Sequence, residues 1–419
     1  MENKQVKFYI VWICGLLLYI YLVIFLWEFS KFLKYSNVVE TNKQQQLSEA
    51  RFFNEADIQT LSIEEIKIRI ISINKQQLVL NEEAYGPLAN DSVIVLIQVH
   101  KRVEYLEHLI YSLSQARNIS QALLIFSHDY YDNAINDLVQ SIKFCKVMQI
   151  FYPHTVQMHP SEFPGDDPNE CSQQSSIEGN PLSKCNNVLH NVTQMKHHWW
   201  WKANMVFNGL EITKHHQGLV LFLEEDHYVA EDFLHVLLLM QESRGNLCPD
   251  CNVLAIGNYL KSFQYFTYHK KVETEPWYVG KHNMGFAINR TLWTNINCCA
   301  KSFCNYNDYN WDWSLQHVSS WCLKSPLLVM AIKGTRVFHI GNCGFHHSSD
   351  DCTSVNLITK VQLVLKSARE AHQLYPTFLR IVKPLLLKRN HLSTNFHSYG
   401  RWADKRDHQL CLNNTLPNR

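Results

Sequence analysis

The feature that most constrains the fold is a short apolar run that ends in three carboxylates. Residues 218–228 read Gly-Leu-Val-Leu-Phe-Leu-Glu-Glu-Asp-His-Tyr. A run of this length, bounded by glycine, is typical of a strand buried on both faces, as in a parallel sheet. Ligands of open α/β sheets bind at the carboxyl ends of such strands, where Glu224, Glu225 and Asp226 lie. We therefore expect an α/β fold whose ligand site contains these acids.

The same three acids indicate a cation. Neighbouring carboxylates repel one another and raise each other's pKa unless a cation or hydrogen bonds compensate. A hard divalent ion held by carboxylate oxygen is a natural compensator. The alternative is a strand that ends in a solvated acidic turn, and this segment alone does not decide between the two.

Strand and helix patterns alternate in the preceding part of the chain. The expected strands span 92–100, 122–126 and 147–151. The first connecting helix has Tyr105, Leu109 and Leu113 on one face, and the second spans 134–144. This βαβαβ alternation predicts a mostly parallel central sheet flanked by helices.

Polar residues follow the first two of these strands. They are His100, Lys101 and Arg102 after the first, and Ser127, His128 and Asp129 after the second. A nucleotide-binding cleft needs such groups at this edge of the sheet, although the loops of ordinary α/β proteins contain them too.

Charge and motif content exclude several other classes. The chain of 419 residues has 39 basic and 38 acidic residues and no basic block, so we expect no nucleic-acid partner. It contains neither a Gly-x-Gly-x-x-Gly nor a Walker sequence, which disfavours dinucleotide and P-loop chemistry.

An uncharged, apolar stretch of twenty residues spans 8–27. At about 1.5 Å per residue a helix of this length crosses roughly 30 Å of hydrocarbon. A signal peptide would have a shorter apolar core and a small-x-small cleavage site, which residues 25–30 do not supply. We therefore expect a cytosolic tail at 1–7, an uncleaved transmembrane anchor at 8–27, a polar stem at 28–65 and a globular domain at 66–419.

Cysteines and glycosylation sequons indicate the compartment of that domain. Twelve of the thirteen cysteines follow the anchor, and sequons occur at Asn90, Asn118, Asn191, Asn289 and Asn413. Both features favour an oxidising lumen and a type II membrane protein. The Cys-x-x-Cys pair at 248 and 251 could instead be a redox pair or half of a zinc site, but no second such pair occurs.

Three tryptophans in a row occur within residues 194–202, which we expect to open a helix. Consecutive residues cannot share one helical face. Some of these rings should pack in the core, which is the commoner role, while another is free to stack on a ligand.

Three further segments complete a candidate catalytic site. Residues 307–313 mix aromatic rings with Asp and Asn, as sugar sites do. We expect a short strand within residues 335–340 that ends in His339, and a loop at 282–285. Transfer from a nucleotide sugar needs a metal for the leaving diphosphate and a general base, for which Asp226 with His339, and Asp312, are the candidates. The alternatives are a helix-start carboxylate for Asp312 and a hydrogen-bonded core histidine for His339.

Five segments of this chain resemble the N-acetylglucosaminyltransferase II family. They are 196–201, 222–228, 282–285, 308–313 and 401–408. The resemblance implies a GT-A type, Rossmann-like fold in a Golgi membrane protein of type II. It also implies an inverting, Mn²⁺-dependent transfer of GlcNAc from UDP-GlcNAc to O2 of the α-1,6-arm mannose of an N-glycan, in β-1,2 linkage. Homodimer formation is left open.

The resemblance also assigns roles to residues. Asp226 and His339 would hold Mn²⁺, and Asp312 would be the catalytic base. Donor contacts would come from Gln98, Val99, His100, Lys101, Arg102, Asp129, Gln194, Met195, Lys196, His197 and His198. Acceptor contacts would come from Glu224, Asn283 and Trp311. The chain departs from the family at Lys101, where Asn is expected, and over 260–268, which match poorly.

Five disulfides are implied by the same resemblance. They are Cys171–Cys185, Cys248–Cys251, Cys299–Cys322, Cys304–Cys411 and Cys343–Cys352. Cys14, Cys145 and Cys298 remain unassigned, and Cys298 beside Cys299 makes one pairing ambiguous.

Two competing functions remain at this stage. One is a lumenal glycan-binding protein that has the same fold but no turnover. The other is a zinc hydrolase that uses some of His197, His198, His346 and His347, although the chain has no His-Glu-x-x-His and adjacent histidines rarely share one tetrahedral ion.

Overall fold

The computed structural model describes residues 61–164, 187–259, 264–341, 354–382 and 400–418. Its first element is α2 (Ile63–Gln76). Within the described residues, no helix combines the length and the apolar character that crossing a membrane requires. The expected anchor at 8–27 and nearly all of the expected stem lie outside the described residues.

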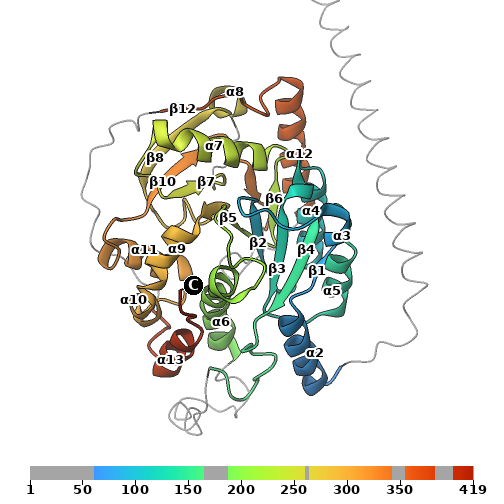
Figure 1. The fold of residues 1–419 in the computed structure, drawn as a ribbon, viewed down its shortest axis with the longest axis vertical. Coiled ribbons are helices and arrows are strands. Elements are labelled where there is room, and N and C mark those ends of the chain that lie inside the picture. The colour runs from blue at the N-terminus through green and yellow to red at the C-terminus, as the bar shows by residue number, and fades with distance from the viewer. Residues whose placement is uncertain (1–60, 165–186, 260–263, 342–353, 383–399, 419) are drawn as a thin grey trace, which may run out of the picture. The chain divides into compact units, whose positions relative to one another are not determined.

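A ten-stranded sheet forms the centre of the fold (Figure 1). In spatial order its strands are β1 (Val79–Leu80), β4 (Lys146–Phe151), β3 (Leu123–His128), β2 (Ile94–Val99), β5 (Val220–Glu224), β9 (Phe286–Ile288), β7 (Val253–Ala255), β10 (Leu328–Ile332), β8 (Lys271–Pro276) and β12 (Arg380–Ile381). Five of the nine neighbouring pairs in the described sheet are parallel, including the whole block β4-β3-β2-β5. A second sheet pairs β6 (His227–Val229) with β11 (Val337–His339). The fold is therefore mixed α/β with a mostly parallel central sheet.

Helices cover both faces of this sheet. In chain order after α2 they are α3 (Glu82–Tyr85), α4 (Val103–Ser114), α5 (Asn133–Gln140), α6 (Asn187–Asn204), α7 (Phe233–Leu247), α8 (Tyr265–Tyr268), α9 (Arg290–Asn297), α10 (Ala300–Asn305), α11 (Trp311–Trp321), α12 (Ser354–Glu370) and α13 (Lys405–Asn413). A 3₁₀ turn spans Ile119–Gln121, and a π-helical turn, Met205–Gly209, continues α6.

The expected βαβαβ unit is confirmed. The strands expected at 92–100, 122–126 and 147–151 are β2, β3 and β4, shifted at their ends by one or two residues. The connecting helices are α4 and α5. The carboxylate of Asp132 fixes the start of α5 by accepting a hydrogen bond from the backbone N–H of Ile135 at 3.0 Å.

The core has two layers because successive strand residues point to opposite faces. In β2, Val95 and Ile97 pack with α4 and α7, while Ile94 and Leu96 pack with α6 and α9. All four side chains are fully buried. Each contributes about 1.5–3 kcal/mol through burial, which explains why the strand is a continuous apolar run.

The three tryptophans of α6 all belong to the core. Trp199, Trp200 and Trp201 are between 0 and 7% exposed. The Trp199 ring stacks on Trp311 with centroids 4.6 Å apart. The expectation that one of the three is free to stack on a ligand is therefore wrong, because helices pack against α6 on more than one side: α11 and α13 both contact it.

Three of the five implied disulfides are present. They are Cys248–Cys251, Cys299–Cys322 and Cys304–Cys411. Cys145 is a buried free thiol and Cys298 an exposed one, so the ambiguity between Cys298 and Cys299 is resolved. The pairs Cys171–Cys185 and Cys343–Cys352, and Cys14, lie outside the described residues.

Candidate active site

Strand register brings the polar residues of three strands to one edge of the sheet. In the parallel ladders, Gln98 of β2 lies opposite Glu224 of β5 and opposite Ser127 of β3. These residues stand at or near the carboxyl ends of their strands. The edge predicted to bind a ligand is thus assembled from residues more than a hundred positions apart.

The middle acid of the three, Glu225, is structural. Its carboxylate accepts hydrogen bonds from the backbone N–H of His100 at 2.7 Å and from Nε of Arg102 at 2.7 Å. It thereby fixes the loop between β2 and α4. The guanidinium of Arg102 also donates from Nη1 to Oδ2 of Asp226 at 2.8 Å. Arg102, an expected donor contact, therefore bridges two of the three acids.

Pairing of the small sheet places His339 beside Asp226. In the ladder between β6 and β11, His339 lies opposite His227, and the backbone N–H of Ile340 donates to the carbonyl of Asp226 at 2.9 Å. Nε2 of His339 lies 3.2 Å from Oδ2 of Asp226. The two predicted metal ligands are therefore neighbours.

Gly341 permits this close approach. A Cβ atom at this position would lie 2.3 Å from Oδ2 of Asp226, so any side chain here would force the carboxylate to move. The chain after β11 therefore needs glycine here because its backbone passes directly against the carboxylate.

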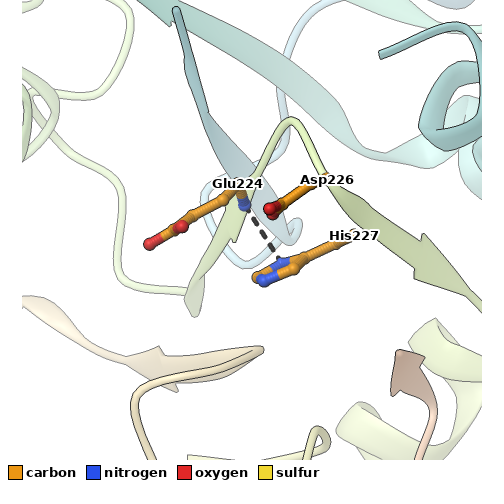
Figure 2. A group of neighbouring side chains, drawn as sticks. All are labelled: Glu224, Asp226 and His227. Atoms are coloured by element: carbon orange, nitrogen blue, oxygen red, sulfur yellow. Dashed lines mark hydrogen bonds between the residues drawn. The ribbon is translucent and has the colours of Figure 1, made fainter. Parts of the chain in front are cut away.

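A group able to hold a metal lies at the turn between β5 and β6. Glu224, Asp226 and His227 each offer a ligand atom, and these atoms lie within 4.8 Å of one another. Figure 2 shows Asp226 and His227 pointing from the start of β6 towards Glu224, with the backbone N–H of Glu224 bonded to Nδ1 of His227 at 3.1 Å. His227 was not among the predicted ligands, although it directly follows Asp226 in the sequence.

The residues present fit a hard divalent cation. Among the described residues, Oδ1 of Asp226 is buried and has no hydrogen-bond partner, which leaves one acceptor of the group unsatisfied. Carboxylate oxygens with one or two imidazoles suit Mn²⁺ in chemistry and number. Burial raises the pKa of Asp226, but His339 and Arg102 beside it outweigh burial and hold the pKa well below its usual value. Asp226 is therefore ionised and ready to bind a cation.

Asp312 stands in the first turn of α11 and is a half-buried carboxylate. Its Oδ2 accepts a hydrogen bond from Nδ2 of Asn283 at 2.8 Å, and its Oδ1 accepts from the backbone N–H of Trp313 at 2.8 Å. Desolvation by burial, together with the charges of Asp308 and Glu224, raises the pKa of Asp312 to about 7. A carboxylate with a pKa near neutrality is suited to accept a proton at physiological pH.

Tyr259 links the metal group to Asp312. Its ring lies 5.9 Å from the ring of His339, measured between centroids. Burial and then the charges of Glu224, Asp312 and Asp226 raise the pKa of its phenol. Asn283 bonds to both the Tyr259 hydroxyl and the Asp312 carboxylate, so Tyr259 connects Asp312 with His339, the neighbour of Asp226. Sequence reasoning missed Tyr259 because it adjoins the stretch that matches the family poorly.

The expected donor residues His100 and Asp129, which directly follow β2 and β3, form a second polar group with His198 of α6. Nδ1 of His100 and Oδ1 of Asp129 are 2.5 Å apart, and Nδ1 of His198 lies 3.3 Å from the other carboxylate oxygen. Ser127 bonds to Nε2 of His198 at 2.8 Å. Burial lowers the pKa of His100, but the Asp129 carboxylate outweighs burial and raises it. Lys101 is exposed and covers the ring of Tyr130, and Val99 is buried in the core.

The run from Gln194 to His198 divides between two sides of α6. Gln194 bonds to the backbone of Val156 and Asp129, so it adjoins the donor group, while Met195 is half-buried. The ammonium of Lys196 instead donates to the carbonyls of Tyr306 and Asp308 at 3.0 Å each. His197 pairs with Asp407 at 2.8 Å. Lys196 and His197 therefore join α6 to the segment between α10 and α11 and to α13, respectively.

Lys202, which sequence reasoning also missed, lies beneath the site. It is 1% exposed, and its ammonium donates to Oε1 of Gln98 at 2.7 Å. Burial lowers the pKa of Lys202, and the Glu224 carboxylate opposes that shift. The residue appears in the sequence only as the polar end of the tryptophan run.

The expected acceptor residues differ in exposure. Glu224 and Asn283 are half-buried and face the site, whereas Trp311 is 9% exposed and stacks on Trp199.

Adjacent His197 and His198 have different partners, Asp407 and Asp129, so they do not form a zinc pair. His346 and His347 lie outside the described residues.

Comparisons with known proteins identify the family. Residues 67–411 match the model of N-acetylglucosaminyltransferase II (MGAT2). The chain is 35% identical over 367 residues to the alpha-1,6-mannosyl-glycoprotein 2-beta-N-acetylglucosaminyltransferase of Homo sapiens, which covers 85% of this chain and 80% of the relative. The enzyme of the same name from Rattus norvegicus is 35% identical over 352 residues, which cover 82% of this chain and 78% of the relative. A crystal structure of S. aureus TarS 1-349 in complex with UDP-GlcNAc aligns with a TM-score of 0.33 at 12% identity, over 67% of this chain and 69% of that chain. On the family match and the identity to these relatives, the chain belongs to the N-acetylglucosaminyltransferase II family.

Proposed function

We propose that this protein transfers GlcNAc from UDP-GlcNAc to O2 of the α-1,6-arm mannose of an N-glycan, with inversion, in a GT-A type fold. The observation that carries the proposal is the chain of contacts from Asp312, a carboxylate with a pKa raised to about 7, through Asn283 and Tyr259 to His339 beside the acidic metal group. The relatives' printed activity supports the choice of donor sugar and of acceptor mannose.

Asp226 and His339 would hold Mn²⁺, and His227 and Glu224 are additional candidate ligands. Bound there, Mn²⁺ supplies a Lewis acid that stabilises the charge of the departing UDP. The unsatisfied Oδ1 of Asp226 supports this assignment, because Arg102 and His339 both contact Oδ2.

Asp312 acts as the general base. It takes the proton of the mannose hydroxyl while that oxygen attacks the anomeric carbon of GlcNAc. Asn283 donates to Oδ2 of Asp312 and so fixes the orientation of the carboxylate. Glu224, which belongs to the metal group, and Tyr259, whose ring contacts His339, are the candidates to orient the acceptor. Trp311, which directly precedes Asp312, supports the acceptor side by stacking on Trp199.

Gln98 and the group formed by His100, Asp129 and His198 bind the donor nucleotide. Their polar atoms converge at the carboxyl ends of β2 and β3, beside the metal group. The surface that binds the donor also contains Lys101, Arg102, Gln194 and Met195.

We further propose that residues 8–27 anchor the chain in the Golgi membrane with residues 66–419 in the lumen. The described disulfides support an oxidising compartment. Protease protection of the large part in sealed vesicles would test this orientation, and digestion of that part in intact vesicles would refute it.

A defined transfer assay tests the function. The full chain is incubated with UDP-GlcNAc and a mannose-terminated N-glycan that already carries GlcNAc on its α-1,3 arm, and the product linkage is mapped. We expect β-1,2-linked GlcNAc on the α-1,6 arm, loss of turnover on chelation and recovery with Mn²⁺. Recovery with Zn²⁺ alone, or hydrolysis in place of transfer, would refute the proposal.

Asp312→Asn separates a transferase from a glycan-binding protein. We expect kcat to fall by about 10²–10⁴-fold, the usual contribution of general base catalysis, while UDP binding is retained. If the wild-type chain binds the glycan but yields no product, the protein is a glycan-binding protein and not a transferase.

A further inference from the structure

A cavity of about 830 Å³ lies at the end of the sheet opposite to the candidate active site. It opens at the amino ends of β2, β3 and β4, next to Ser92, Ala122 and Lys146, and one wall is α7. The proposed function makes no use of this cavity.

Two of the five sequons lie at this cavity. Asn118, which begins Asn-Ile-Ser, is one of its lining residues. Asn90, which begins Asn-Asp-Ser, stands between Ala89 and Asp91, which also line it. Both asparagines are exposed. The cavity is therefore next to two acceptors for N-linked sugar.

The backbone holds Asn118 in a fixed position at the cavity wall. It has φ of 64°, in the left-handed region that asparagine tolerates better than most residues, and its carbonyl accepts from the backbone N–H of Gln121 at 3.1 Å. Its side chain makes no capping hydrogen bond to the 3₁₀ turn that follows. The backbone of Asn118 is thus held at the cavity wall, and its exposed side-chain amide is available for modification.

The lining suits the inner sugars of an N-glycan. Leu238 is 40% exposed, and with Tyr85 it offers apolar surface on which a sugar face can pack. Arg117, Gln121 and Glu242 line the same cavity and offer donors and acceptors for hydroxyl and N-acetyl groups. Apolar surface combined with a few polar groups is the usual composition of a sugar site.

We propose that Asn118 carries an N-linked oligosaccharide whose first sugars occupy this cavity. The proposal rests on the lumenal location given above. The donor is an oligosaccharide on a lipid diphosphate: Nδ2 of Asn118 bonds to its anomeric carbon, the bond from that carbon to the diphosphate oxygen breaks, and the diphosphate leaves with the electron pair. The amide loses one proton. The glycan is then held at the amino edge of the strands, while the candidate active site occupies the carboxyl edge.

The test uses the full chain expressed in a eukaryotic secretory pathway. An amidase that cleaves N-glycans in isotopically heavy water converts a modified Asn118 to labelled Asp, which peptide mass spectrometry detects. We expect labelling at Asn118 in most copies, and release from the native chain about tenfold slower than from the heat-denatured chain, because the cavity shields the linkage. An unlabelled Asn118, or equal release from both states, overturns the proposal.

Ser120→Ala supplies the matched variant. It removes the sequon but keeps the Ser120 carbonyl, which accepts from Lys146 at 3.4 Å. We expect the Ser120→Ala variant to lack one glycan. If that variant fails to fold, Asn118→Gln replaces it as the variant without the sequon. A transfer assay on the same preparation distinguishes the two proposals, since an active chain without sugar at Asn118 refutes only this inference. Labelled Asn118 in an inactive chain refutes only the proposed function, and a chain unmodified at all five sequons refutes the lumenal location as well.

Discussion

Asp312 shows how the position of a single carboxylate prepares it for proton transfer. Burial in the first turn of α11 removes water from the carboxylate, and the neighbouring charges of Asp308 and Glu224 disfavour ionisation further. Two hydrogen-bond donors, Asn283 and the Trp313 backbone, prevent a larger shift. The result is a base that exchanges its proton near neutral pH.

This position predicts the pH dependence of turnover. Asp312 accepts a proton only when it is ionised, so kcat/KM should rise with pH through a pKa of about 7 and level off above it. Below that pKa the rate should fall by about tenfold per pH unit, the limiting slope for one essential base. The measurement is kcat/KM from pH 5 to 9 at saturating Mn²⁺, with UDP binding followed over the same range as the control. A profile that is flat through neutrality contradicts the assignment of Asp312.

Gly341 gives a second prediction at the scale of one residue. Gly341→Ala forces a methyl group against the Asp226 carboxylate, so we expect Mn²⁺-dependent UDP binding to weaken by at least about tenfold, roughly 1.4 kcal/mol. Gly245→Ala in α7 is the matched control, because a Cβ there meets no atom within 4 Å. Calorimetry of UDP binding to both variants gives the comparison. If the two bind UDP equally, the backbone at 341 does not limit the metal group.

At the scale of elements, the pairing of strands, and not the local sequence, brings the site residues together. The ladder of β2 with β5 sets Gln98 against Glu224, and the ladder of β6 with β11 sets His339 against His227. The apolar runs of β2, β3 and β5 predicted these strands and the edge at which their polar ends meet, because a strand buried on both faces has a distinctive composition.

Other contacts could not be predicted from the sequence. The strands β6, β7, β9 and β11 have three residues each, which is too short for a periodic signal. The role of Glu225 as an anchor for the loop after β2 depends on a hydrogen bond to His100, 125 positions away. The contacts of Lys196 and His197 could not be predicted for the same reason. Helical geometry determines which side of α6 each residue faces, but their partners belong to distant segments of the chain.

Helix α6 gives the prediction at this scale. Lys202 lies at its carboxyl-terminal end and holds the side chain of Gln98 at the donor edge, so it is a positioning residue. Lys202→Met should raise the KM for UDP-GlcNAc by about tenfold and leave the KM for the glycan within about twofold, as loss of one charged hydrogen bond costs about 1.5–3 kcal/mol. Lys202→Arg should recover part of the loss. Equal rises in both KM values would indicate a general packing defect.

At the scale of the whole molecule, disulfides connect segments that are far apart in the sequence. Cys304–Cys411 joins α10 to α13 across a separation of 107 residues. Both helices pack near α6, where Lys196 and His197 bond to the same region. This bond therefore holds the carboxyl-terminal helix against the layer that supports Asp312.

The separation of its cysteines predicts what this disulfide contributes to stability. Closing a loop of this length in the unfolded chain stabilises the native state by about 4.7 kcal/mol in the chain-entropy model, against roughly 2 kcal/mol for the loop of Cys248–Cys251 with its separation of 3. We therefore expect Cys304→Ala with Cys411→Ala to lower the free energy of unfolding by about 3 kcal/mol more than Cys248→Ala with Cys251→Ala. Denaturant unfolding of the two double variants measures the difference. If the two double variants lose the same free energy of unfolding, the long loop is already restrained in the unfolded chain. The packing of α13 on α6 would then be what keeps the carboxyl terminus in place.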